Sequence, residues 1–279
     1  MKKLILATVA AAALTMAAGA ASAAEEGSWT GVYIGVSAGF ADRNESGGET
    51  ILFDTNLDGN FGDTVNTAAG ANAFSPGFCG GSFNTNAAAG GCRKDDDTDT
   101  EIGIRAGYDY QFAGNWVVGG VVEYSQLELS DAVTAFSTTP ASYNFTRKLK
   151  NTFAVRARGG YAYENLLVYG TGGYAVGDIK HSFRTTNTAN AFPLSGGGSA
   201  KGYQWGLGAE YKIMPNVTIG GEFIRTRLKD DDFGTRATNS GTTAATNPFL
   251  LVNTGGTGFL RTDHHFDYNS FRLTAAYRF

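Results

Sequence analysis

The sequence contains few of the residues that mark several common classes of protein. Its 279 residues include two cysteines, five prolines and three histidines. Lys and Arg total 22 against 26 Asp and Glu, so there is no basic excess with which to bind nucleic acid. After residue 23, no segment is long and apolar enough to span a membrane as a helix. We therefore expect neither a nucleic-acid partner nor a retained helical anchor.

The N-terminus has the pattern of a cleaved secretory signal peptide. Two lysines precede an apolar run at residues 4–18, and the small residues at 21–23 form a cleavage site of the A-x-A kind. We expect residues 1–23 to be removed on export and residues 24–279 to form the mature domain.

The two cysteines, Cys79 and Cys92, bracket the flexible stretch GGSFNTNAAAGG. In an exported chain such a pair favours a disulfide, which would contribute about 3 kcal/mol by restricting the unfolded chain. A metal site is the alternative, but it requires further ligands that the neighbouring sequence lacks. We predict the disulfide Cys79–Cys92.

Glycine and aromatic residues are abundant, with 39 glycines and 13% aromatics. Glycine weakens helices and aromatic side chains favour strands, so the composition indicates many strands and turns. The stretches GYDYQFAGNWVVGG, GYAYENLLVYGTGG and GAEYKIMPNVTIGG recur about fifty residues apart, and each has the pattern strand, tight turn, strand. Propeller blades also recur at about fifty residues, but each blade needs four strands and these stretches supply two. The predicted turn centres are Gly114, Glu164 and Pro215.

Apolar and polar residues alternate along most of the expected strands. In the C-terminal FRLTAAYRF, every second residue from Phe271 to Phe279 is apolar, and Arg272 and Arg278 lie on the other parity. Successive side chains of a strand point to opposite faces, so such a strand has one apolar face and one polar face. The strands that start at Trp116, Leu166 and Val217 alternate less clearly. Clear alternation is also present at residues 32–40, 102–112, 153–161 and 203–211.

Long polar stretches separate the hairpins and are expected to be loops. Eight strands of about ten residues, joined by tight turns at one end and long loops at the other, are the pattern of an outer-membrane barrel. Lipid cannot hydrogen-bond an open sheet edge, so membrane strands close into a ring with one parity facing lipid and the other facing a narrow interior. The sequence therefore predicts an all-β fold, an eight-stranded antiparallel up-and-down transmembrane β-barrel with long extracellular loops, over residues 24–279. The expected loops are residues 41–100, 130–148, 180–199 and 229–264.

Many aromatic residues fall near the end of the barrel that carries the tight turns. Amphipathic aromatic rings are favoured at the membrane interface, so we expect these residues to form a girdle there. The predicted girdle consists of Trp29, Tyr110, Phe112, Trp116, Tyr161, Tyr163, Tyr211, Tyr277 and Phe279.

The inward parity of the strands collects charged residues of both signs. The interior of an eight-stranded barrel is just wide enough for side chains to fill it, so these charges are expected to pair across the lumen and close the pore. The alternative is a narrow polar path that opens when pairs exchange partners. The predicted lumen charges are Glu101, Arg105, Asp109, Glu123, Arg156, Arg158, Glu210, Glu222 and Arg272.

The signal peptide, WTGVYIGVSAGF, GYAYENLLVYGTGGYAVG and the terminal AAYRF resemble the alphaproteobacterial outer-membrane porin-like family, which has an OmpA-type transmembrane barrel. The resemblance covers almost all of the mature chain. It implies a location in the bacterial outer membrane, in contact with membrane lipid and lipopolysaccharide. It also implies that the barrel assembly machinery recognises the last strand, with Tyr277 and Phe279 as the assembly signal.

The resemblance implies a structural, porin-like surface protein anchored by its lipid-facing strands. Two alternatives remain open at this point, a low-conductance solute channel and a loop-mediated receptor for haem or adhesin for a host. Loops of mixed polar composition do not identify a host or small-molecule ligand.

The segment FDTNLDGNFGD has oxygen-bearing side chains at the spacing of a calcium-binding loop. Its residues Asp54, Asn56, Asp58 and Asn60 match the first half of that motif, but Val65 stands where the motif requires a bidentate Glu. Turns stabilised by Asn and Asp side chains explain the segment without a metal. We expect no bound cofactor, with calcium in this first loop as the alternative. The acidic run at 95–99 is expected to be a solvated loop.

Enzymatic activity is not expected. A lipid hydrolase would need a nucleophile beside a base, and the neighbours His181 and Ser182 are the obvious pair. Adjacent residues of a strand point to opposite faces, so these two side chains cannot readily hydrogen-bond. The remaining histidines, His264 and His265, are expected where the last loop meets the barrel, as a solvated pair or as ligands of haem iron or a divalent metal.

Overall fold

The structure, a computed structural model, describes residues 28–43, 47–94, 98–230 and 233–279. The expected signal peptide and residues 95–97 of the acidic run lie outside these ranges. The described residues form strands and two single-turn 3-10 helices, η1 (Ala88–Gly90) and η2 (Pro248–Leu250). No helix among them is long and apolar enough to cross a membrane.

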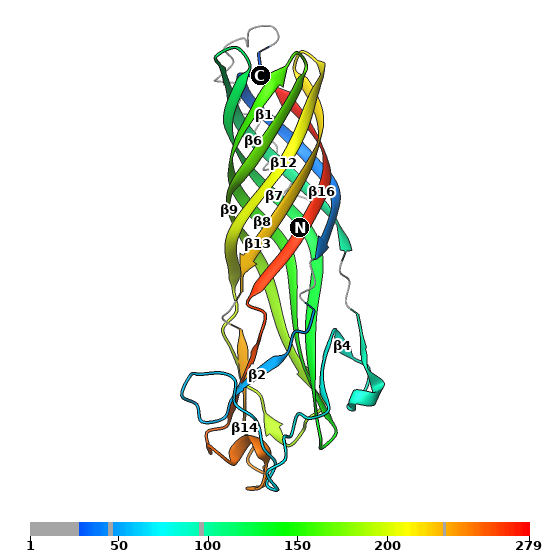
Figure 1. Ribbon diagram of the computed structural model, residues 1–279, viewed down its shortest axis with the longest axis vertical. Coiled ribbons are helices and arrows are strands. Elements are labelled where there is room, and N and C mark those ends of the chain that lie inside the picture. The colour runs from blue at the N-terminus through cyan, green and yellow to red at the C-terminus, as the bar shows by residue number, and fades with distance from the viewer. Residues whose placement is uncertain (1–27, 44–46, 95–97, 231–232) are drawn as a thin grey trace.

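Eight long strands, each antiparallel to its neighbours, form a ring (Figure 1). The order around the ring is β1, β6, β7, β8, β9, β12, β13 and β16, and β16 pairs with β1. The turns that join β6 to β7, β8 to β9 and β12 to β13 lie at one end, which we call the short-turn end. The strands are β1 (Gly31–Arg43), β6 (Thr98–Phe112), β7 (Trp116–Ser137), β8 (Ala141–Tyr163), β9 (Leu166–Thr185), β12 (Ser199–Met214), β13 (Val217–Lys229) and β16 (His265–Arg278).

The three predicted hairpin turns are confirmed. Strand β6 ends at Phe112 and β7 begins at Trp116, and both Ala113 and Gly114 have positive φ, of 46° and 81°. Two consecutive residues of positive φ are characteristic of the turn whose twist matches that of the strands it joins. A glycine at the second position supplies this conformation without steric cost. The other turns fall between β8 and β9 and between β12 and β13.

The prediction that residues 130–148 form a loop is wrong. Strand β7 continues to Ser137 and strand β8 begins at Ala141, so a turn of only a few residues remains between them. Residues 131–136 and 141–145 are buried on both faces, because other parts of the chain cover the outer side of these strands. A strand that is buried on both sides shows no alternation, and its polar residues then resemble a loop.

The other expected loops also contain strands, which form an outer section at the end opposite the short turns (Figure 1). Strands β14, β15 and β2 pair in that order, β10 and β11 pair with β14, β3 pairs with β7, and β4 pairs with β5. Aromatic side chains fill its interior, with Phe74 stacked on Phe53 and edge-on to Phe259 and Tyr143. The short strands are β2 (Ile51–Asp54), β3 (Gly77–Gly80), β4 (Ser82–Phe83), β5 (Cys92–Arg93), β10 (Asn190–Ala191), β11 (Leu194–Ser195), β14 (Gly234–Asn239) and β15 (Thr257–Arg261).

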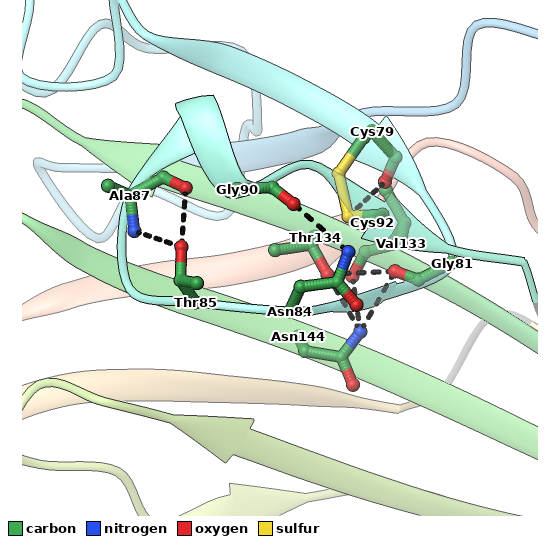
Figure 2. The surroundings of a disulfide bond; sticks show 10 residues. All are labelled: Cys79, Gly81, Asn84, Thr85, Ala87, Gly90, Cys92, Val133, Thr134 and Asn144. Atoms are coloured by element: carbon green, nitrogen blue, oxygen red, sulfur yellow. Dashed lines mark hydrogen bonds between the residues drawn. A yellow bond between two sulfur atoms is a disulfide. The ribbon is translucent and has the colours of Figure 1, made fainter.

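The disulfide Cys79–Cys92 joins β3 to β5 in the outer section (Figure 2). The segment between them is also held to the long strands by a buried amide. Asn144 Nδ2 donates hydrogen bonds of 2.9 Å to Thr134 Oγ1 and 3.3 Å to the carbonyl oxygen of Gly81. The disulfide thus fixes a flap that packs on the outer face of β7 and β8.

Trp29 was expected in the interfacial aromatic girdle, and this prediction is wrong. Its side chain has 0% exposure and packs inside the short-turn end against Val117, Ala162 and Leu167. Trp29 precedes β1, so no strand alternation fixes which way its ring points. The girdle members on the long strands are exposed as predicted, apart from the half-buried Phe279.

The last strand, β16, pairs with the first, β1, as predicted. Tyr33 lies opposite Arg278, and the Phe279 backbone N–H donates a 3.0 Å hydrogen bond to the carbonyl oxygen of Val32. The Phe279 ring lies edge-on to Tyr277, with 5.0 Å between ring centroids. The terminal residue therefore contributes both to the closing pair of strands and to the aromatic girdle.

Replacing Phe279 with Asp is expected to reduce the folded population strongly, because it places a charge in the girdle beside the closing strand. The measurement is heat-modifiable gel mobility of outer-membrane fractions, with protease access in whole cells. Val252→Asp, the same kind of change at an exposed residue of the outer section, is the control and should assemble normally. Equal assembly of both variants would remove this role for the terminal ring.

Candidate functional site

The nine predicted lumen charges all point inward and are buried. The strict period of two in β-strands places them on the inner parity of β6, β7, β8, β12, β13 and β16. Arg278, on the same parity of β16, is also buried and belongs to the same set. With Arg278, this set consists of five acids and five bases. They form two layers across the barrel, a middle layer and an inner layer nearer the short turns.

In the middle layer, Glu222 is held by two arginines from opposite sides. Arg105 Nη2 lies 3.0 Å from its carboxylate, and Arg272 Nη2 lies 2.8 Å from it. Arg272 also reaches Glu101, with 2.9 Å between Nη1 and Oε1. Each of these groups is almost fully buried, so water competes little with these ion pairs.

Glu123 completes the middle layer. Its Oε2 lies 3.1 Å from Arg105 Nε and 3.2 Å from Arg156 Nη2, and Arg272 also contacts it. Arg156 Nη1 donates a further hydrogen bond of 2.5 Å to Gln204 Oε1. The three acids and three bases of this layer thus form one connected network.

The inner layer pairs two arginines with two acids. Arg278 Nη2 lies 2.6 Å from Asp109 and 3.4 Å from Glu210. Arg158 Nη1 lies 2.9 Å from Glu210, and Arg158 Nε lies 3.4 Å from Asp109. Each charge therefore has two partners of the opposite sign.

Tyr169 connects the two layers and Tyr33 contacts the inner layer, and neither tyrosine was identified from the sequence. Tyr169 Oη donates a 3.1 Å hydrogen bond to Glu222, and the Arg158 guanidinium lies 3.9 Å from the Tyr169 ring centroid. Tyr33 Oη accepts a 3.0 Å hydrogen bond from Arg158. The sequence did contain a signal for these two inward aromatics, because each faces a glycine on the neighbouring strand. Tyr33 lies opposite Gly107, and Tyr169 lies opposite Gly208. A Cβ at either glycine would come within 2.4 Å of the facing ring.

The short-turn end of the lumen is covered by Trp29. Arg278 and Lys212 place their cationic groups 4.8 Å and 4.6 Å from its ring centroid. Lys212 Nζ also donates a 2.7 Å hydrogen bond to the carbonyl oxygen of Ser28. The residues just before β1 are thus drawn across the barrel end by two inward bases.

On the far side of the middle layer, apolar side chains fill the lumen. Along the inner parity of β7, Leu127 and Leu129 follow Glu123 and precede Asp131. The same order occurs on β8, where Leu149 lies between Arg156 and Arg147, and on β13, where Leu228 lies between Glu222 and Asp230. This apolar belt consists of Ala41, Leu127, Leu129, Leu149, Ala154, Ala175, Ile179, Ala200, Leu228, Phe266 and Tyr268.

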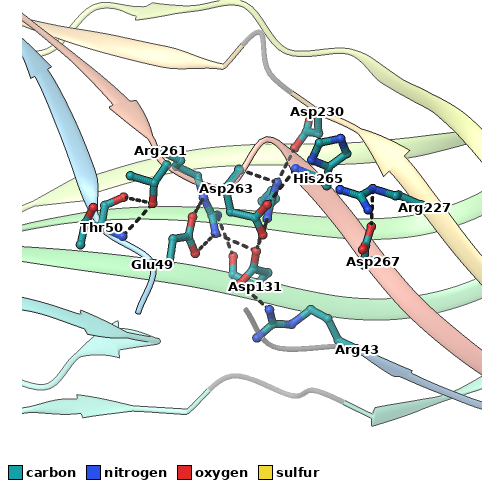
Figure 3. A network of polar contacts seen from close by, with 12 residues as sticks. Arg43, Glu49, Thr50, Asp131, Arg227, Asp230, Arg261, Asp263, His265 and Asp267 are labelled. Atoms are coloured by element: carbon teal, nitrogen blue, oxygen red, sulfur yellow. Dashed lines mark hydrogen bonds and ion pairs between the residues drawn. The ribbon is translucent and has the colours of Figure 1, made fainter. Parts of the chain in front are cut away.

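Beyond the apolar belt lies a second set of charges, the outer cluster, centred on Asp131 (Figure 3). The Asp131 carboxylate contacts Arg43 at 2.9 Å, Arg147 at 2.6 Å and Arg261 at 2.7 Å. Burial alone would raise the pKa of this carboxyl, but the three guanidinium groups outweigh it and hold the pKa well below its usual range. Glu49 pairs with Arg261 at 2.6 Å. The cluster links β1, β7, β8 and β15.

His181 joins the outer cluster through Asp230, with 2.8 Å between its Nε2 and the carboxylate. The ring also stacks on Phe233, with centroids 4.7 Å apart. Ser182 is exposed on the opposite face of β9, as the alternation predicted. Burial raises the pKa of Asp230, but its hydrogen bond to His181 and the nearby cations lower it overall. His264 and His265 are half-buried at the start of β16.

The calcium-like segment uses its side-chain oxygens in turns. Asp54 Oδ2 accepts a 2.9 Å hydrogen bond from Gly59 N, and Asn56 Oδ1 accepts one of 3.0 Å from Asp58 N. Asp58 Oδ1 accepts one of 2.8 Å from Asn60 N, and this bond lowers the pKa of the Asp58 carboxyl. Among the described residues, no three His, Cys, Asp or Glu side chains are placed to hold a metal ion.

Arg272→Ala should destabilise the barrel by roughly 3 kcal/mol or more, because it leaves buried carboxylates without a counter-charge. The free energy of unfolding can be measured by urea titration in lipid vesicles. Arg236→Ala, which removes an exposed base of the outer section, should have little effect. If both variants unfold at the wild-type urea concentration, the lumen pairs do not hold the barrel together.

Asp131→Asn should loosen the outer section at neutral pH by about 3 kcal/mol, because three guanidinium groups lose their shared carboxylate. The folded pKa of Asp131 is depressed, so its stabilisation is complete above the usual value of 3.8 and is lost as pH falls below it. Amide hydrogen exchange of β15, corrected for intrinsic rates, should show this acid loss in wild type and a smaller one in Asp131→Asn. Asp178→Asn, which changes an exposed carboxylate, is the control and should match wild type. If Asp131→Asn kept the wild-type pH profile, Asp131 would not be the group responsible for the loss of stability in acid.

Two curated relatives are similar to this chain over most of their length. The 31 kDa outer-membrane immunogenic proteins of Brucella melitensis and Brucella suis are each 30% identical over 244 residues, which is 82% of this chain and 88% of the relative. Among solved structures, OprG of Pseudomonas aeruginosa covers 90% of this chain and 97% of its own, at 13% identity and a TM-score of 0.44. Ail of Yersinia pestis covers 89% and 99%, at 12% identity and a TM-score of 0.35.

The family model described as "Outer membrane protein beta-barrel domain" matches residues 10–279. This match covers all of the long strands, and the first of the two relatives above is named an outer-membrane protein. The chain therefore belongs to the outer-membrane β-barrel family and is a protein of the bacterial outer membrane.

Proposed function

We propose that the protein is a structural surface protein of the outer membrane, an eight-stranded transmembrane barrel whose lumen is sealed. The short-turn end faces the periplasm and the outer section faces the cell exterior. The lipid-facing strands anchor the protein, and the outer section is the part that meets the surroundings. The protein is not an enzyme in this proposal.

The observation that carries the proposal is the filling of the lumen along its whole length. From the short turns outward, the interior holds Trp29, the inner layer, the middle layer, the apolar belt and the outer cluster. Opposite charges that pair in a dry interior leave little room for water or ions. The apolar belt is a further barrier to ions, and this barrier remains even when the ion pairs exchange partners.

The outer surface of the long strands supports the anchoring role. Exposed apolar side chains cover it between the aromatic girdle and the outer section, for example Leu273 at 74% and Phe271 at 61% exposure on β16. In water such a surface would be an aggregation hazard, but in a bilayer it is matched by the hydrocarbon. We further propose that Tyr277 and Phe279 at the end of this surface form the signal read by the assembly machinery.

The contacts of His181, the histidine considered for catalysis, fit a structural role. His181 is bonded to Asp230 and covered by Phe233, and Ser182 lies on the other face. The histidine is therefore engaged in packing the outer section. The two Brucella relatives are named as immunogenic proteins, and exposure of the outer section at the cell surface would give this chain a comparable position.

A low-conductance channel is the second candidate, because Glu222 and Glu123 each contact three arginines and pairs of this kind can exchange. Single-channel recording of the refolded full chain in planar bilayers separates the two. We expect no steady conductance in wild type or in Arg272→Ser, because the apolar belt remains. Combining Arg272→Ser with Leu129→Ser and Leu149→Ser should open a path for ions.

The combined variant serves as the positive control for insertion and detection. A steady wild-type current, in recordings where folding is verified by gel mobility, would overturn the sealed barrel in favour of the channel. Leu207→Ser, which changes an exposed lipid-facing leucine, is the matched control and should stay silent.

A further inference from the structure

A cavity lies in the outer section, where three segments that are far apart in the sequence come together. The turn between β7 and β8 forms one wall, the segment that follows β9 forms another, and η2 forms the third. The volume of the cavity is about 240 Å³. We call it the outer cavity, and its lining consists of residues 137–141, 186–189 and 247–249 with Ala73 and Tyr143.

The outer cavity has a buried floor and an exposed mouth. Ala73, Tyr143 and Phe249 form the floor and are nearly fully buried. The rings of Tyr143 and Phe249 pack edge-on, with 5.7 Å between their centroids. Thr138 and Thr188 lie at the mouth and are exposed. The cavity is therefore a bowl that opens to the surroundings of the outer section.

Three asparagine side chains hold two of the walls in place. Asn187 Nδ2 donates a 2.9 Å hydrogen bond to Tyr143 Oη and one of 3.1 Å to Asn190 Oδ1. Asn247 Nδ2, at the start of η2, donates one of 3.0 Å to the same oxygen of Asn190. The segment after β9 is thereby fixed both to β8 and to η2. A cavity that is already formed loses little conformational freedom when it binds a ligand.

The third wall, the turn between β7 and β8, is held from two sides. The Thr138 backbone N–H donates a 2.8 Å hydrogen bond to the carbonyl oxygen of Ala73. From the flap that the disulfide closes, Asn86 Nδ2 donates one of 3.3 Å to the carbonyl oxygen of Pro140. All three walls of the outer cavity are therefore positioned by contacts that do not involve a ligand.

The lining of the outer cavity is polar but uncharged. None of the described residues that form it is acidic or basic, so a carboxylate, phosphate or ammonium group would enter without a counter-charge to offset its desolvation. The hydroxyl groups of Thr138 and Thr188 have no hydrogen-bond partner in the described part of the chain and are available to a ligand. Pro140 and Pro248 add apolar surface. The lining therefore favours a neutral ligand with hydroxyl groups.

We propose that the outer cavity binds one uncharged saccharide ring, from a free monosaccharide or from the end of a neutral glycan. Such a ring carries hydroxyl groups around its edge and apolar C–H groups on its faces, which matches the threonines and prolines of the lining. Pockets for drug-sized ligands span roughly 300–1,000 Å³, so a cavity of about 240 Å³ has room for a single ring and none for a haem macrocycle. The inference does not depend on whether the lumen conducts, so a failure of the sealed-barrel proposal would leave it standing.

The test uses the refolded full chain in nanodiscs of phosphatidylcholine, because detergents with sugar headgroups would compete for the site. The hexose probes are glucose, galactose and mannose. Glucuronic acid adds a carboxylate to such a ring, and cyclohexanol is a ring of similar size with a single hydroxyl group. Titrations followed by saturation-transfer difference NMR measure the affinity of each probe. Maltotriose, compared with glucose, distinguishes the end of a glycan from a free sugar, and preference for either supports the proposal.

Two variants remove the site in different ways. Ala189→Trp fills the cavity from its exposed rim. Thr138→Val/Thr188→Val removes both available hydroxyl groups while keeping the shape of the side chains. Ala89→Trp, at an exposed alanine of η1 outside the lining, is the control for the first variant and should bind as wild type does. Heat-modifiable gel mobility verifies that each variant is folded.

We expect at least one of the three hexoses to bind wild type, and glucuronic acid and cyclohexanol to bind more weakly than that hexose. Ala189→Trp should abolish binding. Thr138→Val/Thr188→Val should weaken binding about fivefold for each hydroxyl group removed, because each loses one neutral hydrogen bond to the sugar. Its control, Thr64→Val/Thr254→Val, changes two exposed threonines outside the lining and should leave the affinity unchanged.

Several results would overturn the proposal. One is the failure of all three hexoses to bind folded wild-type protein. Another is wild-type affinity in Ala189→Trp or in Thr138→Val/Thr188→Val, which would place the sugar elsewhere on the protein. These variants change different residues, so either one carries this comparison if the other does not fold. Equal binding of glucuronic acid would show that the uncharged lining does not select the ligand, and equal binding of cyclohexanol would show that the hydroxyl groups are not recognised.

Discussion

The need to satisfy every backbone hydrogen bond inside the bilayer shapes the rest of this protein. Lipid offers no partner for an open edge, so β16 must pair with β1 and the eight strands must form a ring. A ring of this size has a narrow interior, and the inward side of each strand must then be filled by side chains. The ion pairs, the inward tyrosines and the apolar belt are three solutions to the same packing problem.

The charged layers and the apolar belt contribute differently to the molecule. A buried ion pair is costly to desolvate, so its partners must be positioned accurately, and Arg272 with its three carboxylates shows how register achieves this. The belt needs no such accuracy, because apolar packing is not directional. Charges therefore fix which strands lie opposite each other across the lumen, while Leu129, Leu149 and Phe266 exclude water beyond them.

Sequence reasoning was reliable wherever one face of a strand met lipid and the other met the lumen. The period of two then assigned Glu101, Arg105 and Arg156 to the interior, although it could not choose their partners, which depend on the stagger of strands far apart in sequence. It was wrong for residues 130–148, where both faces are buried and alternation disappears. The prediction for Trp29 was wrong for a related reason. Trp29 lies outside a strand, so strand alternation does not determine which way its side chain points.

The apolar surface does not reach the same height on every strand. On β12 the outward side chains remain apolar or aromatic from Ile213 to Tyr203, whereas on β13 the run that begins at Val217 already ends at Phe223. Adjacent strands thus require different hydrocarbon thicknesses from one bilayer. A short apolar run is accommodated by local thinning of the membrane, which costs fractions of a kcal/mol per Å. The bilayer is therefore expected to be thinner on the side of the barrel where the apolar runs end early than on the side where they continue.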